Sequence, residues 1–193
     1  MGRPCAILRV CTPWLATALL VAPAFATTLR FDDTRSLTRG SREIVIGQVE
    51  SARSYWNETH TRIFTDVTVS VTRSLKGSPG GTLTLTQLGG TVDGMRYEVP
   101  GCPAFKPGEE ALFFVWRDAK GRAQLNGLAQ GKFDIRRDPT TGAGFVQRAA
   151  PGFGVRELKR LERLSAGEAA PDLRLDDLIR EIQRALAEPN ADR

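Results

Sequence analysis

The chain has 193 residues, of which 41% are hydrophobic and 25% are charged, with 19 Gly, 11 Pro and 3 Cys. This composition is that of an ordinary globular domain, and it excludes a disordered chain, a collagen-like chain and a disulfide-rich miniprotein. The 27 basic and 22 acidic side chains give a net charge of +5, which is small and spread out, so no nucleic-acid partner is expected.

Residues 1–26 have the three parts of a secretory signal. Arg3 and Arg9 lie before an apolar run from Val10 to Ala22, and Ala24-Phe25-Ala26 has the small-x-small pattern of a cleavage site. The apolar run is shorter than the roughly 20 residues that a membrane span needs. We therefore expect cleavage after Ala26, a secreted or periplasmic protein, and no transmembrane span in the mature chain.

Cleavage at this site would change the charge and the cysteine content. Without Arg3 and Arg9, 25 basic side chains face 22 acidic ones, a net charge of +3, and Cys102 is the one cysteine left. No internal disulfide can then form. A single thiol in an oxidising compartment is buried, paired between chains or reactive, and burial is the expectation here because free cysteine is among the most buried residue types.

From residue 43 onward, alternation of apolar and polar residues predicts strands. The first covers Glu43–Ser51, and Gly47 indicates a bulge within it. The clearest covers Arg62–Leu75, where a period of two and many β-branched residues exclude a helix. Further strands are predicted over Thr82–Thr86, Thr91–Val99, Glu110–Trp116, Ala123–Leu128, Lys132–Arg136 and Gly144–Arg148. The candidate core consists of Ile44, Ile46, Val49, Val67, Val69, Val71, Leu83, Leu85, Leu112, Phe114 and Val115.

After Pro151 the apolar period becomes helical. Leucines at every third position predict a short helix over 155–164, and a stripe from Leu175 to Leu186 predicts a terminal helix that packs on the sheet or across a barrel mouth. The expected organisation is a signal peptide (1–26), an N-terminal extension (27–42), a β-barrel or sandwich domain (43–150) and a C-terminal helical segment that packs on it (151–193).

The chain holds no complete catalytic, metal-binding or nucleotide-binding motif. His60 is its one histidine, so a zinc site of the usual ligand types is not expected, and we expect no cofactor. A thiol-dependent enzyme is the alternative: it would use Cys102 with His60 and a nearby acid such as Asp66, Asp93 or Glu98, and it requires these groups to meet in space.

Aromatic residues are the candidate contact residues. Tyr55 and Trp56 lie beside a polar loop, and Tyr97 and Phe105 lie near Gly-rich and Pro-rich turns. Trp116 ends a strongly apolar strand and is expected in the core. Rigid aromatic rings supply much of the contact area of protein interfaces. We therefore expect a partner to bind through the loops 53–61 and 89–108.

Four segments carry a family resemblance: Ile44–Val49, Phe64–Val69, Ser74–Gly77 and Pro107–Phe113. They resemble exported bacterial proteins of unknown function and, more distantly, netrin-like and TIMP-like modules. The resemblance implies a five-stranded OB-type barrel with helical packing and a binding role. TIMP-like inhibitors begin with a cysteine that engages the protease zinc, whereas the mature chain here would begin at Thr27, so inhibition does not carry over.

Together these observations predict a mainly β protein, an antiparallel OB-like barrel or sandwich with one or two C-terminal helices. The expected function is that of an exported, non-catalytic binding or assembly module of the cell envelope, with a protein or another envelope surface as its partner.

Overall fold

The structure is a computed structural model, and it describes residues 32–149 and 173–188. Within these residues the fold is mainly β, as predicted, with an eight-stranded sheet, a two-stranded sheet and two α-helices. In chain order the elements are α1 (Thr34–Gly40), β1 (Glu43–Trp56), β2 (Ile63–Lys76), β3 (Thr82–Leu88), β4 (Gly90–Val92), β5 (Met95–Tyr97), β6 (Glu110–Arg117), β7 (Ala123–Leu125), the 3-10 helix η1 (Leu128–Gly131), β8 (Lys132–Arg137), β9 (Gly144–Arg148), β10 (Leu173–Arg174) and α3 (Leu175–Ala187).

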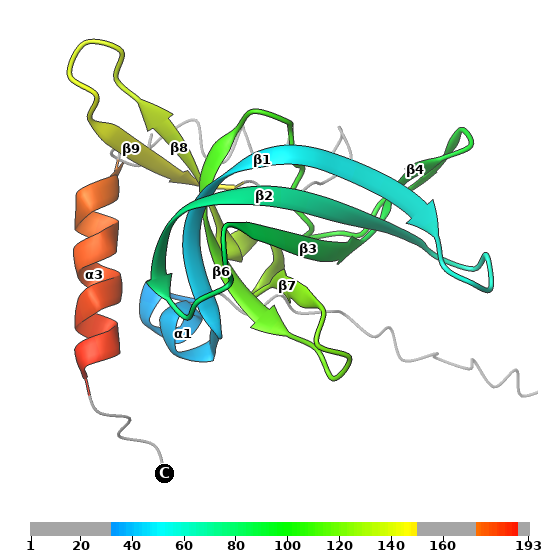
Figure 1. The fold of residues 1–193 in the computed structure, drawn as a ribbon, viewed down its shortest axis with the longest axis horizontal. Coiled ribbons are helices and arrows are strands. Elements are labelled where there is room, and N and C mark those ends of the chain that lie inside the picture. Colours follow the sequence, from blue (N-terminus) through cyan, green and yellow to red (C-terminus); the bar gives the residue numbers. More distant parts are fainter. Residues whose placement is uncertain (1–31, 150–172, 189–193) are drawn as a thin grey trace, which may run out of the picture.

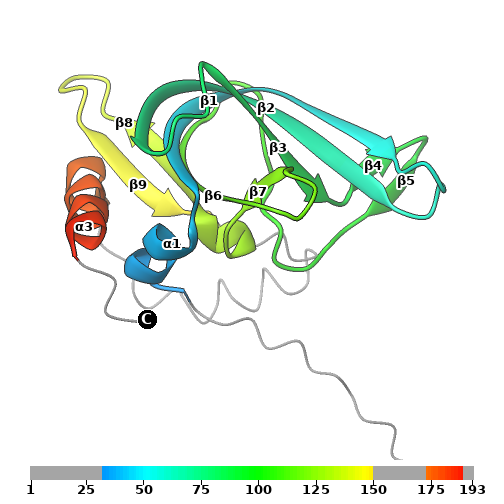
Figure 2. The ribbon, with the colours of Figure 1, turned by 60° about the horizontal axis from the view of Figure 1, so that its bottom comes forward.

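Five strands form a partly closed ring, seen end-on in Figure 2. The order around the ring is β1-β2-β3-β7-β6, and β6 pairs with β1 to complete it. All of these pairings are antiparallel except that of β3 with β7, which is parallel and consists of one residue pair, Leu85 with Ala123. Beyond the ring, β8, β9 and β10 extend the sheet from β6.

Apolar side chains pack on both sides of the sheet. The cluster inside the ring consists of Val45, Val49, Val67, Val69, Leu83, Leu85, Ala111, Phe113, Val115, Ala123 and Leu125. The cluster outside it lies between the sheet and the helices and consists of Leu37, Ile44, Ile46, Leu112, Phe114, Phe133, Ile135, Val146, Leu175, Leu178, Ile179 and Ile182. The stripe of α3 therefore packs on the outer face of the sheet and not across a barrel mouth (Figure 1). Every candidate core residue is buried except Val71, which is half-buried.

Strand β1 can pair on both sides because it is irregular and carries Gly47. Its register with β2 shifts at three places, one of them between Ile46 and Gly47, which confirms the predicted bulge. Gly47 lies opposite Val71 of β2 and Ala111 of β6. A Cβ atom at this position would lie 2.5 Å from the backbone oxygen of Ser70. The strands approach too closely here for any side chain.

Helix α1 was not predicted within the extension 27–42, and its two ends are held by side chains. At its N-terminus, the Asp33 carboxylate accepts a hydrogen bond of 2.7 Å from the Ser36 amide. At its C-terminus, Lys76 Nζ donates to the carbonyl oxygens of Thr38 at 2.8 Å and Ser41 at 2.5 Å. These bonds satisfy backbone groups that a helix leaves without partners, and burial lowers the pKa of Lys76.

Further expectations were wrong. The first four residues of the predicted loop 53–61 belong to β1, which continues to Trp56, and the strand predicted over Ala123–Leu128 ends at Leu125. Residues 91–99 do not form one strand, because Asp93 and Gly94 adopt positive φ angles of 50° and 76° and reverse the chain between β4 and β5. Trp116 is not in the core: its side chain is 38% exposed, since it lies on the outer face of β6 beyond the cluster that the helices cover.

The end of α3 differs slightly from expectation, since Ala185 is buried while Leu186 is 39% exposed. The helix expected over 155–164 lies outside the described residues.

The close approach at Gly47 gives a stability prediction. We expect Gly47→Ala to lower the free energy of unfolding by about 2 kcal/mol, because the added methyl group overpacks the junction of three strands. Gly81→Ala is the matched control, since a Cβ atom there would meet nothing within 4 Å, and it should change stability by less than about 0.5 kcal/mol. Urea denaturation of both variants checks this, and equal midpoints for the two would contradict it.

Candidate functional site

A cavity of about 370 Å³ lies where the connection from β3 to β6 crosses one end of the ring. Its wall comes from the inner faces of β1, β2 and β3 and from the β4–β5 hairpin with the segment that follows it. The lining residues are Ala52, Ser54, Thr65, Gln87, Leu88, Gly89, Gly90, Thr91, Arg96, Tyr97, Glu98, Val99, Cys102, Pro103, Ala104 and Phe105. A volume of this size is at the lower end of the range of small-molecule pockets.

The floor of the cavity is polar because the inward-facing side chains of the strands change from apolar to polar toward this end. On β2 the alternation that places Val69 and Val67 inside the ring next places Thr65 there. On β3 the same alternation leads from Leu85 to Gln87, which pairs with Thr65. The inner cluster therefore ends at Val67 and Leu85 on these two strands, and Thr65 and Gln87, which form hydrogen bonds, line the space next to it.

The hydroxyl groups of the floor form a short chain of hydrogen bonds. Thr65 Oγ1 donates to the carbonyl oxygen of Gly89 at 2.6 Å, and it lies 2.9 Å from Ser54 Oγ. Ser54 Oγ also accepts from the Thr91 amide at 3.3 Å. Gly90 packs directly on this pair: its φ is +141°, and a Cβ atom there would lie 2.3 Å from Ser54 Oγ. These contacts hold the start of the hairpin against the barrel.

The β4–β5 hairpin projects from the barrel beside the cavity (Figure 1). Two of its side chains are unusually exposed for apolar residues, Met95 at 56% and Tyr97 at 43%. Arg96 and Glu98 form an ion pair at the same place. Exposed Met, Tyr and Arg side chains in one short strand are typical of protein interfaces, where these three residue types are enriched.

A buried lysine contacts the part of the cavity wall formed by Phe105. Lys132 is 2% exposed, and its Nζ atom lies 2.8 Å from Glu109 Oε1 and 2.5 Å from Asp134 Oδ1. The same ammonium group lies 5.3 Å from the centre of the Phe105 ring, within the range of a cation–π interaction. Phe105 also stacks on Phe113 of the inner cluster, with ring centres 6.4 Å apart. The cavity wall at Phe105 is therefore anchored to the core.

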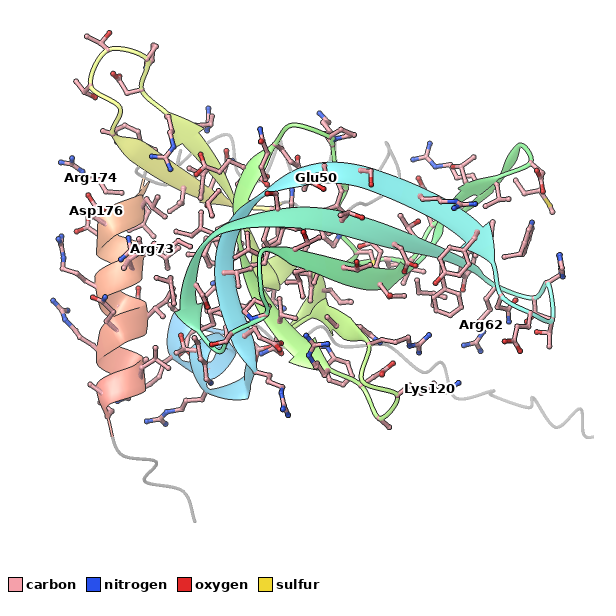
Figure 3. All side chains as sticks on the ribbon, viewed as in Figure 1. Glu50, Arg62, Arg73, Lys120, Arg174 and Asp176 are labelled. Carbon is pink, nitrogen blue, oxygen red and sulfur yellow. The ribbon has the colours of Figure 1, made fainter. Side chains whose placement is uncertain are left out.

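Figure 3 shows Arg62 at the turn between β1 and β2 and Lys120 at the turn between β6 and β7, both extending outward from the barrel.

Of the four predicted contact aromatics and the predicted thiol, three line this cavity: Tyr97, Cys102 and Phe105. Glu98, one of the acids named for the thiol alternative, also lines it. The other two aromatics do not. Tyr55 lies on the opposite face of β1 from Ser54, where its hydroxyl donates to Asp66 Oδ1 at 3.2 Å, and burial together with the Asp66 charge raises its pKa. Trp56 is half-buried and stacks on His60, with ring centres 6.2 Å apart.

Cys102 and His60 are not brought together in the cavity wall. Cys102 is half-buried in the lining, which agrees only in part with the expected burial. His60 is not a lining residue, and it lies in the exposed turn between β1 and β2 with a φ of 50°. Burial raises the pKa of the Cys102 thiol, which lowers the thiolate fraction at neutral pH, whereas a nucleophilic cysteine needs the opposite shift.

Sequence reasoning missed Ser54, Thr65 and Gln87. A signal was present, since Thr65 is a polar residue on the face of β2 that otherwise carries Ile63, Val67 and Val69. A polar position between two buried apolar ones, here Ile63 and Val67, indicates a place where the apolar packing is interrupted.

Compared with known proteins, the chain matches no family model and no curated protein sequence. Among residues 32–149 and 173–188, no helix is long and apolar enough to cross a membrane. Across these same two ranges no three His, Cys, Asp or Glu side chains gather where they could hold a metal ion.

The raised pKa of Cys102 gives a prediction on reactivity. In a chain with Cys5→Ser and Cys11→Ser, we expect iodoacetamide to alkylate folded Cys102 more slowly than free cysteine at pH 7.5. The alkylation rate should rise with pH. The midpoint of this rise should lie at higher pH for the folded chain than for the denatured chain, because burial disfavours the thiolate. Mass spectrometry of samples quenched at successive times measures both rates. Alkylation of the folded protein faster than of free cysteine would contradict the environment described for this thiol.

Proposed function

We propose that this chain is an exported, non-catalytic binding module of the cell envelope, secreted or periplasmic, and that its partner is a protein. The partner would contact the cavity and the adjacent β4–β5 hairpin, which together we call the cavity face. The observation that carries this proposal is the position of exposed Met95 and Tyr97 directly beside a cavity with a mixed polar and apolar lining. Such a combination of an exposed apolar patch and a concave site is characteristic of interaction surfaces.

The type of barrel also supports a binding function. The OB-fold is a five-stranded, partly open barrel that binds its ligands with one face of its strands and with its loops. The order β1-β2-β3-β7-β6 with a parallel closing pair is in keeping with an OB-type barrel. The netrin-like and TIMP-like resemblance, which implies such a barrel and a binding role, is part of this proposal. Fold alone does not define a function, so the proposal depends on the cavity face.

Binding is favoured over thiol catalysis by the surroundings of Cys102. Its lining neighbours include no histidine, and burial raises its pKa. A general base within hydrogen-bond reach is the first requirement of a cysteine nucleophile. His60 stacks on Trp56 instead.

The test is comparative capture from the native extracellular fraction. We expect the double variant Met95→Ala, Tyr97→Ala to lose the captured protein by at least about tenfold, since truncation of interface hot spots costs about 2 kcal/mol or more. Thermal stability should be unchanged because both side chains are exposed. Quantitative mass spectrometry of the eluted proteins measures the loss.

Leu186→Ala is the matched control, because Leu186 is 39% exposed and lies on α3, on the other side of the molecule from the hairpin (Figure 1). It should retain the captured protein in full. Capture of the same proteins in equal amounts by the wild type, the double variant and the control would refute binding through the cavity face.

A further inference from the structure

No charged side chain of residues 32–149 or 173–188 lines the interior of the cavity. Arg96 and Glu98 are the charged side chains of its lining. They form an ion pair with each other, and their side chains are 72% and 48% exposed, so they lie at the mouth. A charged group that entered the interior would lose its hydration without gaining a counter-ion, which is costly.

The hydroxyl groups of the floor are already satisfied. The Gly89 carbonyl can only accept, so Thr65 must donate to it, and Ser54 must then donate to Thr65. The Thr91 amide donates to Ser54. This chain leaves neither hydroxyl proton free for a ligand.

The remaining polar side chain of the floor is the carboxamide of Gln87, and the neighbouring Pro103 carbonyl defines its orientation. Its one hydrogen bond is to the carbonyl oxygen of Pro103, which can only accept, so the NH₂ group must face Pro103. The other terminal atom, Oε1, is then an acceptor that is shielded from solvent and has no hydrogen-bond partner among the described residues. A buried acceptor of this kind costs free energy until a donor reaches it.

A ligand would reach Oε1 only after the Gln87 side chain turns, because this oxygen is shielded from solvent in the structure. The hydrogen bond of Gln87 to Pro103 measures 3.3 Å, longer than the usual distance of about 2.9 Å for an N–H···O bond. Gln87 is half-buried, and Phe105 and Val99 line the cavity alongside it. A group that enters would meet apolar side walls and, once the Gln87 carboxamide has turned, an amide oxygen without another partner.

Resting on the function proposed above, we propose that the partner protein inserts an uncharged carboxamide side chain, Gln or Asn, into this cavity. Its N–H group donates to Gln87 Oε1, and its methylene groups pack against Phe105 and Val99. Its own carbonyl oxygen accepts from the Gln87 NH₂ group, which gives two hydrogen bonds between two amides. Met95 and Tyr97 contact the chain that carries it.

Three blocked tripeptides test this in solution: N-acetyl-Ala-Gln-Ala-amide and its analogues with Glu or Leu at the centre. The three share one backbone, so a difference between them reports on the central side chain. Titrations followed by ¹H–¹⁵N NMR should shift the Gln87 side-chain NH₂ signals and the backbone signals of residues 87–105. We expect the Glu and Leu peptides to bind at least fivefold more weakly than the Gln peptide.

Gln87→Leu removes the acceptor and should weaken the Gln peptide at least fivefold, whereas Gln147→Leu, on the exposed side of β9, should not change its binding. Equal binding of the three peptides, or no shift with the Gln peptide at 10 mM, overturns the carboxamide proposal. So does binding of cellotriose without binding of the peptide, which would indicate a glycan ligand. Loss of capture in the hairpin double variant is a separate readout, so the proposed function can stand when the carboxamide proposal fails.

Discussion

The structure depends on one strand that pairs on both sides. Between Glu43 and Gln48, β1 pairs with β6, and over a longer stretch it pairs with β2. Without Gly47 the two neighbours could not come so close, because the Ser70 carbonyl lies where a side chain would begin. The bulges turn β1 around the inner cluster, so the sheet curves into a ring. The outer face of the same strands then provides a surface for α1 and α3.

The cavity is a consequence of this curvature. The ring holds an apolar cluster over only part of its length, and next to this cluster the inner faces of β2 and β3 carry Thr65 and Gln87. The chain between β3 and β6 crosses this end and is held there by hydrogen bonds to Ser54 and Thr65 and by the Lys132 contact with Phe105. A rigid barrel thus positions a concave, partly polar site next to an exposed hairpin, in keeping with the general tendency of loops on rigid scaffolds to carry function.

Local patterns predicted much of the fold. Strict alternation identified β2 and β3, and the 3.6-residue period identified α3, because these patterns reflect burial on one face of a single element. The continuous apolar run identified β6, which is buried on both faces. The turn between β4 and β5 also has a local signal, Asp93-Gly94, which was read as part of one strand. Helix α1 is too short for a periodic pattern, although Asp33 is a typical N-cap residue.

The site was harder to predict because it is assembled from distant parts of the chain. Tyr97, Cys102 and Phe105 were chosen for their chemistry, and the structure places them in one wall. Their neighbours Ser54, Thr65 and Gln87 come from three strands, and only the pairing registers bring them together. Tyr55 and Trp56 have suitable chemistry, but strand alternation and the Trp56 contact with His60 keep them out of the lining.

The central claim is that the five strands close into a ring with a cavity at its end. Closure between β3 and β7 consists of one residue pair, Leu85 with Ala123, so this pair is the most direct place to test it. In a ¹³C,¹⁵N-labelled sample, we predict interstrand nuclear Overhauser effects between the backbone protons of Leu85 and Ala123, along with those between Ile46 and Leu112 of β1 and β6. Contacts between β1 and β6 without any between β3 and β7 would show an open sandwich and contradict the closed ring.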